Sequence, residues 1–356
     1  MNKRVLVALS GGVDSSVCVH LLKEQGYDVG GVVLKMSPAH DETVAAAKDA
    51  AASFDIPLFV SDMTERFEAM VVDYFMAEYK AGRTPNPCIR CNPTVKFRAL
   101  LETADEKGYE KVATGHYAGL EERGGVTLLK KAACLKRDQS YMLYRLGQDV
   151  LSRLILPLAA MEKTEVRAIA ERLGIAAAKK PDSQEICFIP DNNYAKYIED
   201  RLGPSPKGEF IAPWGKVCGE HRGILHYTVG QRKKLGIALG EPVFIKTIDP
   251  EENRIYLARA GEDKIRTVFL SQLTAPDGKP FPKRFRAEVK LRSVAQPVPA
   301  EIFCEGDRGE LWLDEPYRVV AKGQSAVFYN GDVVLGGGVI EGGGEPPLAV
   351  RAQTYC

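Results

Sequence analysis

The sequence predicts an α/β fold with a doubly wound parallel-sheet domain at the N-terminus, then a small β-rich central domain and a C-terminal β-barrel. Three observations predict it. Buried strands alternate with helices up to residue 200, a glycine-rich turn follows the first strand, and short strands with frequent glycine and proline fill the remainder. Strands that alternate with helices are typical of a parallel sheet with helices on its faces.

The N-terminal elements follow from the spacing of apolar residues. RVLVAL (4–9) predicts a buried strand, and the helix after it ends at Gly26, a common helix terminator. The same reasoning predicts strands at 29–36, 58–63 and 111–118 and a hairpin that turns at 124–125. It predicts helices at 42–53, 65–80, 96–108, 164–174 and 192–202. NPCIRCN (86–92) is expected to be a loop restricted by its prolines.

The second half of the chain predicts β structure. Apolar and charged residues alternate in AEVKLRS (287–293), as in a strand with one wet face, and Asn330-Gly331 is a good hairpin turn. We therefore expect three domains: residues 1–200 with the catalytic site, 201–274 as the small β-rich domain that contacts RNA, and 275–356 as the barrel.

Composition and charge narrow the functional classes. Lys and Arg total 48 against 47 for Asp and Glu, so no overall basic field indicates a nucleic-acid partner and any RNA-binding surface must be local. The first apolar run is about five residues long, too short for a signal peptide or membrane span, so we expect a cytoplasmic protein. The eight cysteines are too sparse for a disulfide scaffold and should be thiols in the cytosol.

SGGVDS (10–15) has the composition and position of a phosphate-binding loop. It joins the first strand to the first helix, where open parallel sheets bind ligands, and its glycines let backbone approach a phosphate closely. The Gly-Lys-Ser/Thr ending of a Walker A loop is missing. The segment instead resembles the loop of the pyrophosphate-loop ATPases, a Rossmann-like group that transfers AMP to a substrate oxygen.

The pair Cys88 and Cys91 leaves four chemistries open: half a zinc site, a redox pair, cluster ligands, or a nucleophile with a neighbour. Zinc fits least, since a structural site needs four ligands and no second close pair follows. Among pyrophosphate-loop enzymes, those that form a carbon–sulfur bond need a sulfur carrier. A cysteine thiol near the nucleotide would therefore indicate that sulfur is the nucleophile that displaces AMP.

Seven segments together resemble the tRNA-specific 2-thiouridylases (MnmA family), almost end to end. They are ALSGGVDSS, EYKAGRTPNPCIRCN, ATGHYA, RDQSYMLYRL, PDSQEICFI, HYTVGQRKKLGI and KGQSAVFYNGDVVLGGG. The resemblance implies a tRNA-uridine 2-sulfurtransferase that uses ATP and Mg²⁺. It would adenylate the C2 oxygen of the wobble uridine and replace it with sulfur from a carrier protein's persulfide.

The resemblance also implies roles for individual residues. Cys187 would carry the persulfide, Cys91 would be the nucleophile that forms a transient disulfide with it, and Asp14 would help to organise Mg²⁺ and pyrophosphate. ATP would contact Ala8, Leu9, Ser10, Gly11, Gly12, Val13, Asp14, Ser15, Met36 and Gly115. The target base would contact Asn86, Pro87 and Cys88, and the tRNA would contact His116, Arg137, Asp138, Gln139, Arg292, Ser293 and Gln324.

Two alternatives stay open at this point. Many relatives have aspartate in the place of Cys88. The Cys88 thiol is therefore a third sulfur at the expected site, and it could join Cys91 and Cys187 as a ligand of a [4Fe–4S] cluster that binds sulfide. The chain could instead be an ATP-dependent ligase or amidotransferase that acts on a small carboxylate. We expect cationic flanks to favour the thiolates, from Arg90 and Lys96 beside Cys91 and from the lysine pair 179–180 before Cys187.

Overall fold

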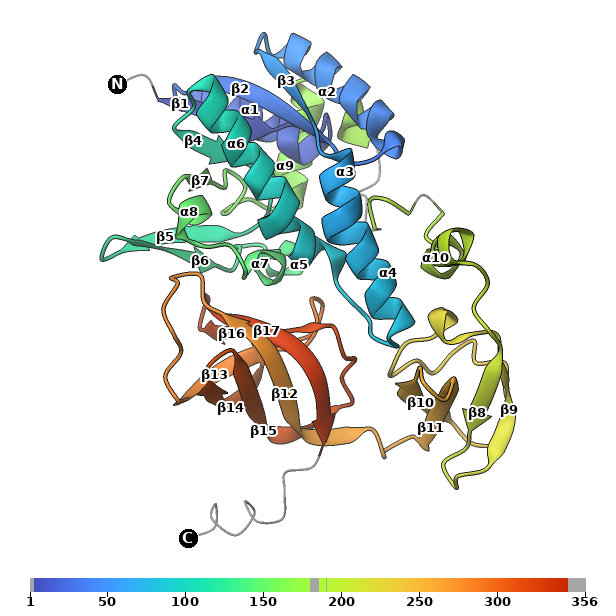
Figure 1. Ribbon diagram of the computed structural model, residues 1–356. Helices are drawn as coiled ribbons and strands as arrows, with labels where there is room; N and C mark the ends of the chain where they lie inside the picture. The colour runs from blue at the N-terminus through green and yellow to red at the C-terminus, as the bar shows by residue number, and fades with distance from the viewer. Residues whose placement is uncertain (1–2, 180–185, 190, 345–356) are drawn as a thin grey trace.

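The computed structural model describes residues 3–179, 186–189 and 191–344. Three sheets organise the chain: a five-stranded sheet, a four-stranded sheet and an eight-stranded sheet. Figure 1 shows the first sheet with its helices at the top, the barrel at the lower left and the four-stranded sheet at the lower right. Within the described residues, no helix combines the length and apolar character needed to cross a membrane.

The first sheet confirms the expected doubly wound α/β domain. Its order is β3-β2-β1-β4-β7, and every pairing is parallel. The strands are β1 (Arg4–Ala8), β2 (Asp28–Lys35), β3 (Leu58–Asp62), β4 (Lys111–Ala113) and β7 (Leu154–Ile155). Because chain order reverses beside β1, its carboxyl end and that of β4 flank the crevice where such sheets bind ligands.

Helices cover both faces of this sheet, and β1 shows why. Its side chains alternate: Val5 and Val7 belong to the apolar core with Val17 and Val166, whereas Leu6 belongs to the core on the other face with Leu100. Helices on the first face include α1 (Val13–Glu24), α2 (Asp41–Ser53) and α9 (Lys163–Arg172). The opposite face receives α6 (Phe97–Lys107).

The cysteine segment 86–92 is helical, so the loop expected there is wrong. Asn86 caps α5 (Pro87–Cys91) by accepting a hydrogen bond from the Cys88 backbone N–H at 3.1 Å. Proline is tolerated at the first helical position, and the chain then continues through a π-helical turn, Asn92–Lys96, into α6. Pro93 lacks the N–H that an α-helical turn would use, which accounts for the wider turn.

A second interrupted helix packs beside the first. It runs through α3 (Thr64–Phe67), a π-helical turn at Glu68–Val72 and α4 (Asp73–Lys80). Arg90 of α5 donates a hydrogen bond to the carbonyl of Met70 in that turn at 3.2 Å. The remaining helices are α7 (Ser140–Leu143), α8 (Gln148–Leu151) and α10 (Tyr194–Leu202).

The C-terminal β-barrel is confirmed as a closed, six-stranded antiparallel barrel. Its order is β12-β15-β14-β13-β16-β17, and β12 pairs again with β17 to close it. The strands are β12 (Lys264–Thr274), β13 (Arg284–Lys290), β14 (Val298–Glu305), β15 (Arg308–Arg318), β16 (Ser325–Asn330) and β17 (Val333–Gly344). The hairpin β5 (Gly119–Arg123) and β6 (Val126–Lys130) of the first domain extends this sheet at Val333.

The central sheet has the order β10-β11-β8-β9. Its strands are β8 (Gly208–Ile211), β9 (Val217–His221), β10 (Val243–Asp249) and β11 (Arg254–Arg259). The expected boundary at residue 275 would separate β12 from the barrel strands with which it pairs. We therefore propose that the barrel begins between Arg259 and Lys264, while the first boundary lies between α10 and β8.

A charged cluster joins the end of α4 to the barrel. Arg83 donates hydrogen bonds to Glu78 at 2.8 Å and to Glu341 of β17 at 2.6 Å, and Ser271 donates to Glu341 at 2.5 Å. Arg83 holds the pKa of Glu341 below its usual value. Next to this cluster, Gln324 of the barrel donates to the carbonyl of Thr84 at 2.7 Å. These contacts hold the segment before α5 against the barrel.

We expect Arg83→Met to lower the free energy of unfolding by about 2 kcal/mol, because Glu78 and Glu341 lose their guanidinium partner in a partly buried interface. Urea unfolding would measure this loss. Arg254→Met is the matched control, since Arg254 also bonds two carboxylates, Glu209 and Glu252, but on an exposed surface. It should cost less than about 1 kcal/mol. Equal losses in the two variants would contradict the coupling role of Arg83.

Candidate active site

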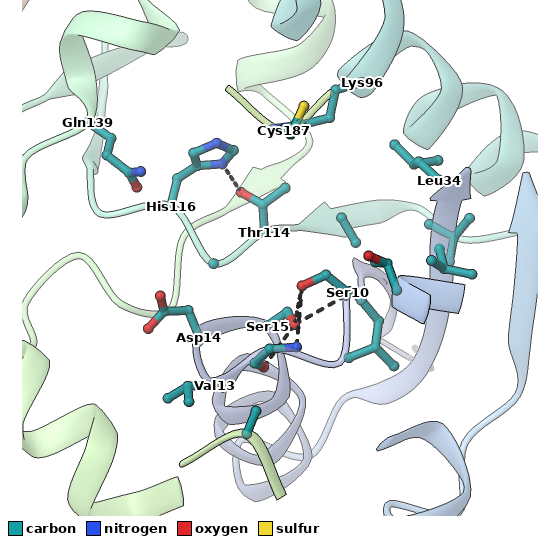
Figure 2. A pocket seen from close by; sticks show the side chains of 18 of the residues that line it. Ser10, Val13, Asp14, Ser15, Leu34, Lys96, Thr114, His116, Gln139 and Cys187 are labelled. Atoms are coloured by element: carbon teal, nitrogen blue, oxygen red, sulfur yellow. Dashed lines mark hydrogen bonds between the residues drawn. The ribbon is translucent and has the colours of Figure 1, made fainter. Parts of the chain in front are cut away.

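A cavity of about 620 Å³ opens at the carboxyl ends of β1 and β4, where the strand order predicts a ligand site. Figure 2 shows the side chains that face it. Most residues expected to bind ATP line this cavity: Ala8, Leu9, Ser10, Gly12, Val13, Asp14, Ser15, Met36 and Gly115. His116, Arg137, Gln139 and Cys187 line it too. The nucleotide loop and the expected persulfide carrier therefore share one space.

Hydrogen bonds within the SGGVDS loop fix its shape. The hydroxyl of Ser15 accepts from the Ser10 backbone N–H at 3.2 Å, donates to the Gly12 carbonyl at 3.1 Å and lies 3.1 Å from the Ser10 hydroxyl. Gly11 has φ +71°, and a Cβ there would lie 2.4 Å from the backbone of Ala46 in α2. Only glycine fits this position, because a side chain would collide with the backbone of α2.

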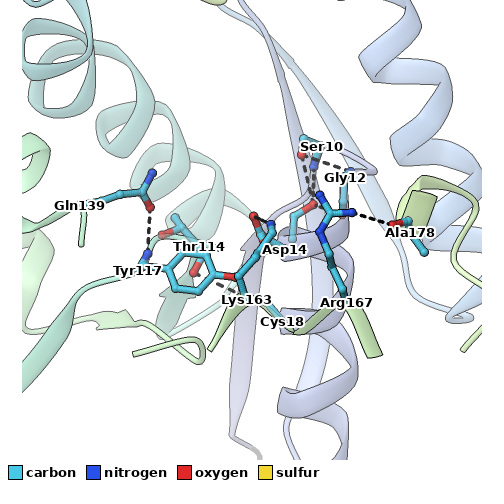
Figure 3. A network of polar contacts seen from close by, with 11 residues as sticks. Ser10, Gly12, Asp14, Cys18, Thr114, Tyr117, Gln139, Lys163, Arg167 and Ala178 are labelled. Carbon is cyan, nitrogen blue, oxygen red and sulfur yellow. Dashed lines mark hydrogen bonds and ion pairs between the residues drawn. The ribbon is translucent and has the colours of Figure 1, made fainter. Parts of the chain in front are cut away.

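Asp14 is held by partners that sequence reasoning missed. The Lys163 ammonium lies 2.7 and 2.8 Å from its two carboxylate oxygens, and the Tyr117 hydroxyl donates to it at 2.9 Å (Figure 3). Lys163 is only 9% exposed and lines the cavity. It sits at the first position of α9, far along the chain, and the helix pattern there carries no signal of this contact. The cavity thus contains a buried cation beside the phosphate loop.

His116 stays neutral at the end of β4. Its Nδ1 lies 2.8 Å from the Thr114 hydroxyl, and its ring stacks on Phe97 with 5.9 Å between centroids. Burial of the ring, with a smaller contribution from the Lys96 ammonium, lowers the pKa of His116 to about 3. At neutral pH it can therefore donate or accept a hydrogen bond but adds no charge to the cavity.

His116 should make the fold sensitive to acid. The unfolded side chain binds a proton near its ordinary pKa of 6.5, whereas the folded one resists protonation down to about pH 3. The unfolded state therefore binds more protons as pH falls below 6.5, and stability should drop by up to about 1.4 kcal/mol per pH unit. We expect His116→Gln to flatten the decline in urea midpoint between pH 6.5 and 4.5. An unchanged slope would contradict this assignment.

Cys187 lines the cavity, whereas Cys88 and Cys91 lie on α5 outside its lining. Cys187 faces the cavity and is exposed, Cys88 is exposed, and Cys91 is only 6% exposed in the apolar core. Burial raises the pKa of Cys91 to about 12 and also raises that of Cys187. Lys96 lowers the pKa of both thiols and so opposes both shifts. Figure 2 shows Lys96 and Cys187 next to each other.

Of the cations expected near the thiols, Lys96 is the one whose charge the structure places close enough to affect Cys91 and Cys187. Arg90 turns to the Met70 carbonyl and the Tyr74 ring, 5.4 Å from the centroid. Of the lysine pair 179–180, residue 180 lies outside the described residues, and the side chain of residue 179 is outside the description as well.

A metal site does not follow from these thiols. In the part of the chain that the structure describes, no three His, Cys, Asp or Glu side chains come together as metal ligands. Cys88, Cys91 and Cys187 therefore do not fit a cluster in this arrangement. Asp14, the residue expected to help organise Mg²⁺, forms an ion pair with Lys163.

The other expected base and tRNA contacts take varied positions. Asn86 caps α5, Pro87 is buried, and the Asp138 carboxylate is buried and accepts hydrogen bonds from Ser140. Gln139 accepts a hydrogen bond from the Tyr117 backbone N–H, and Gln324 donates one to the Thr84 carbonyl. Arg292 is exposed and Ser293 is half-buried between strands β13 and β14. Polar cavity residues that sequence reasoning did not name are His40, Thr43, Thr114, Tyr117 and Lys163.

Family models match almost the whole described chain. They are the tRNA methyl transferase HUP domain over residues 3–191, the tRNA methyl transferase PRC-barrel domain over 195–259, and the aminomethyltransferase beta-barrel domain over 267–340. Among solved structures, a 4-thiouridine synthetase–RNA complex with bound ATP has 20% identity and a TM-score of 0.38, and covers 56% of this chain and 50% of its own.

Relatives in the curated set match end to end. The tRNA-specific 2-thiouridylase MnmA of Clostridioides difficile is 44% identical over 96% of this chain and 99% of its own length. The MnmA of Lachnoclostridium phytofermentans is 43% identical over 95% and 99%. The family models and these relatives both match nearly the whole sequence, and the chain therefore belongs to the tRNA-specific 2-thiouridylase (MnmA) family.

Proposed function

We propose that this protein is a tRNA 2-thiouridine synthase that uses ATP to activate a uridine C2 oxygen and replaces it with sulfur, releasing AMP and pyrophosphate. One observation carries the proposal: Cys187 and the SGGVDS loop line the same cavity. A ligase that acts on a small carboxylate needs no thiol beside its nucleotide. The family relationship supports the enzyme class, the use of ATP and the tRNA substrate.

The activation step depends on charge near the phosphates. Backbone N–H groups at the start of α1 face the loop, and Lys163 places a positive charge beside Asp14. Both stabilise negative charge that develops as pyrophosphate leaves. Mg²⁺ would be held chiefly by phosphate oxygens and water, with Asp14 as its protein ligand, a pattern that this ion commonly adopts.

The sulfur step needs two thiols. The terminal sulfur of a Cys187 persulfide attacks C2 and AMP leaves with the oxygen, which joins the base to Cys187 through two sulfurs. A second thiolate then attacks the Cys187 sulfur, so a protein disulfide forms and the base keeps its new sulfur. The resemblance assigns this second thiol to Cys91. Lys96 lies where it can stabilise thiolates of both cysteines.

The base must reach this cavity from a tRNA loop. Single-stranded loops expose their bases at low cost, so the anticodon loop is a suitable donor of an extruded uridine. Cys88 and Arg292 are exposed and available to such a substrate, and His116, Arg137 and Gln139 line the cavity. We propose that a persulfide carrier protein loads Cys187, and that the enzyme works in the cytoplasm with its tRNA.

The decisive assay combines the protein with ATP, unmodified tRNA and a persulfide donor. We expect 2-thiouridine and AMP from the unchanged protein. Cys187→Ser should abolish thiolation, whereas Cys218→Ser, which alters a half-buried thiol of the central sheet, should not. Thiolation that persists in Cys187→Ser would refute the persulfide role. Iron analysis after anaerobic purification tests the cluster route, because bound iron in proportion to activity would support it.

A further inference from the structure

One short segment of the first domain, residues 138–142, contacts three other parts of the molecule. It bonds to the barrel, to the chain after β4 that carries Tyr117, and to the turn that follows the cysteine helix. The steps of the proposed reaction use none of these contacts. A segment in this position can transmit a change at the barrel to the residues around the nucleotide cavity.

A buried ion pair fixes the segment to the barrel. The Lys290 ammonium of β13 lies 3.9 Å from the Asp138 carboxylate, and the two side chains are only 10% and 3% exposed. The same carboxylate accepts hydrogen bonds from the Ser140 hydroxyl at 2.9 Å and from the backbone N–H groups of Ser140 and Ala132 at 3.1 Å. Because a buried carboxylate without a cation is costly, Lys290 stabilises this whole arrangement.

Two tyrosine hydroxyls bond across the same interface. Tyr141 donates to the Ser325 backbone carbonyl at 2.7 Å, and the hydroxyl of Tyr329 in β16 lies 3.3 Å from that of Ser140. The Lys290 ammonium lies 6.0 Å from the centroid of the Tyr141 ring. Since both tyrosines are fully buried, a shift of the segment relative to the barrel would leave polar groups unpaired in the interior.

The next residue of the segment sets the position of Tyr117. Gln139 donates its backbone N–H to the Tyr117 carbonyl at 2.7 Å, and its side-chain oxygen accepts from the Tyr117 N–H at 2.9 Å. The Tyr117 hydroxyl donates to Asp14 at 2.9 Å, and Asp14 also pairs with Lys163 (Figure 3). Two hydrogen bonds from Gln139 therefore fix the backbone of the residue whose side chain helps to hold the phosphate loop.

The last residue of the segment meets the end of the cysteine helix. Met142 donates its backbone N–H to the Gln139 carbonyl at 2.9 Å, and its own carbonyl accepts from the Asn92 side chain at 2.8 Å. Asn92 directly follows Cys91 and is only 1% exposed. The segment thus supports both the phosphate loop and the helix that carries the expected nucleophile.

We propose that the Lys290–Asp138 pair positions the phosphate loop for ATP, although the pair lies at the barrel interface. It acts through Gln139 and Tyr117, whose contacts lead to Asp14. Among the described residues that line the nucleotide cavity, neither Lys290 nor Asp138 is present, so both are positioning residues. The inference rests on the proposed function, which assigns ATP to this loop, and it gives the barrel a task besides tRNA binding.

The test measures ATP binding to the full-length protein by isothermal titration without tRNA, so that a lost tRNA contact cannot affect the result. Lys290→Met keeps the apolar stem but leaves the Asp138 carboxylate without its cation. We expect the dissociation constant for ATP to rise at least about fivefold, a small part of the roughly 100-fold loss that a misplacement of about 1 Å can cause. Asp138→Asn removes the same pair, keeps an oxygen for the N–H donors, and should weaken ATP binding in the same direction.

Arg153→Met is the matched control. Arg153 also bonds a carboxylate, that of Asp105, and it donates to the backbone carbonyls of Tyr109 and Glu110. These two residues precede β4, at the end of the strand away from the cavity. Arg153→Met should lower stability in urea unfolding but leave the dissociation constant for ATP within about twofold, because distant sites act independently.

A double-mutant cycle tests the path through Tyr117. Tyr117→Phe removes the hydroxyl that bonds Asp14 and should itself weaken ATP binding. If Lys290 acts through this hydroxyl, Lys290→Met should cause less than about a twofold further loss in the Tyr117→Phe protein, because coupled residues are not additive. Fully additive losses would overturn the path.

Two other results would overturn the inference as a whole. One is unchanged ATP binding in both Lys290→Met and Asp138→Asn. The other is a loss no larger than that of Arg153→Met, which would show that the buried pair serves folding alone. If the unchanged protein binds ATP and the variants weaken this binding as expected, but tRNA stays unmodified with ATP and a persulfide donor, the proposed function is refuted and the positioning role stands.

Discussion

Gly11→Ala is expected to abolish ATP-dependent AMP formation, with a loss of at least about 100-fold, because a small displacement of a positioned loop has effects of that size. The backbone at Gly11 has φ +71°, and an added Cβ would lie 2.4 Å from the carbonyl carbon of Ala46 and 2.5 Å from its oxygen. Neither backbone can give way without moving α2 or the loop. Isothermal titration with ATP and an assay of AMP release would measure the loss.

The control separates backbone strain from collision. Gly26 also has a positive φ, +80°, but no atom lies within 4 Å of its Cβ position. Gly26→Ala should therefore lower stability by about 1 kcal/mol and leave ATP binding intact. Gly11→Ala should lose both stability and binding. If Gly11→Ala bound ATP as well as the unchanged protein, the tight approach of α2 would not be what shapes the phosphate loop.

Lys163→Met is expected to reduce AMP formation by about 100-fold or more, the usual effect of removing one preorganised donor from a site where charge develops. The Met side chain keeps most of the apolar stem but removes the ammonium, so that Asp14 keeps the hydrogen bond from the Tyr117 hydroxyl and loses the ion pair. Because Lys163 is 9% exposed, the fold should also lose about 1–3 kcal/mol from the unpaired carboxylate.

Two variants test whether this loss comes from charge at the site. Lys163→Arg keeps the charge and should retain more activity than Lys163→Met. Lys196→Met removes an ammonium from an exposed pair with Asp200 and should change neither activity nor stability by a measurable amount. Equal AMP formation by Lys163→Met and the unchanged protein would show that this ion pair serves folding alone.

Local patterns accounted for much of the fold because neighbouring residues decide it. The apolar run 4–9 and the following glycines predicted the first strand and phosphate loop, and alternation in 287–293 predicted a barrel strand. The cysteine segment was predicted as a loop because its prolines were taken as breakers. Proline at the first helical position instead fits a helix start, and the Asn86 cap depends on side-chain geometry that residue order does not fix.

The sequence by itself determined the family, the α/β architecture, the phosphate loop and the candidate cysteines, because each of these depends on contiguous residues or on a recognisable motif. The tertiary structure alone decided that Lys163 pairs with Asp14 across 149 positions, that the β5–β6 hairpin joins the barrel sheet, and that Cys91 is buried while Cys88 is open. These outcomes depend on how distant segments pack, and packing sets both the partners and the exposure of a side chain.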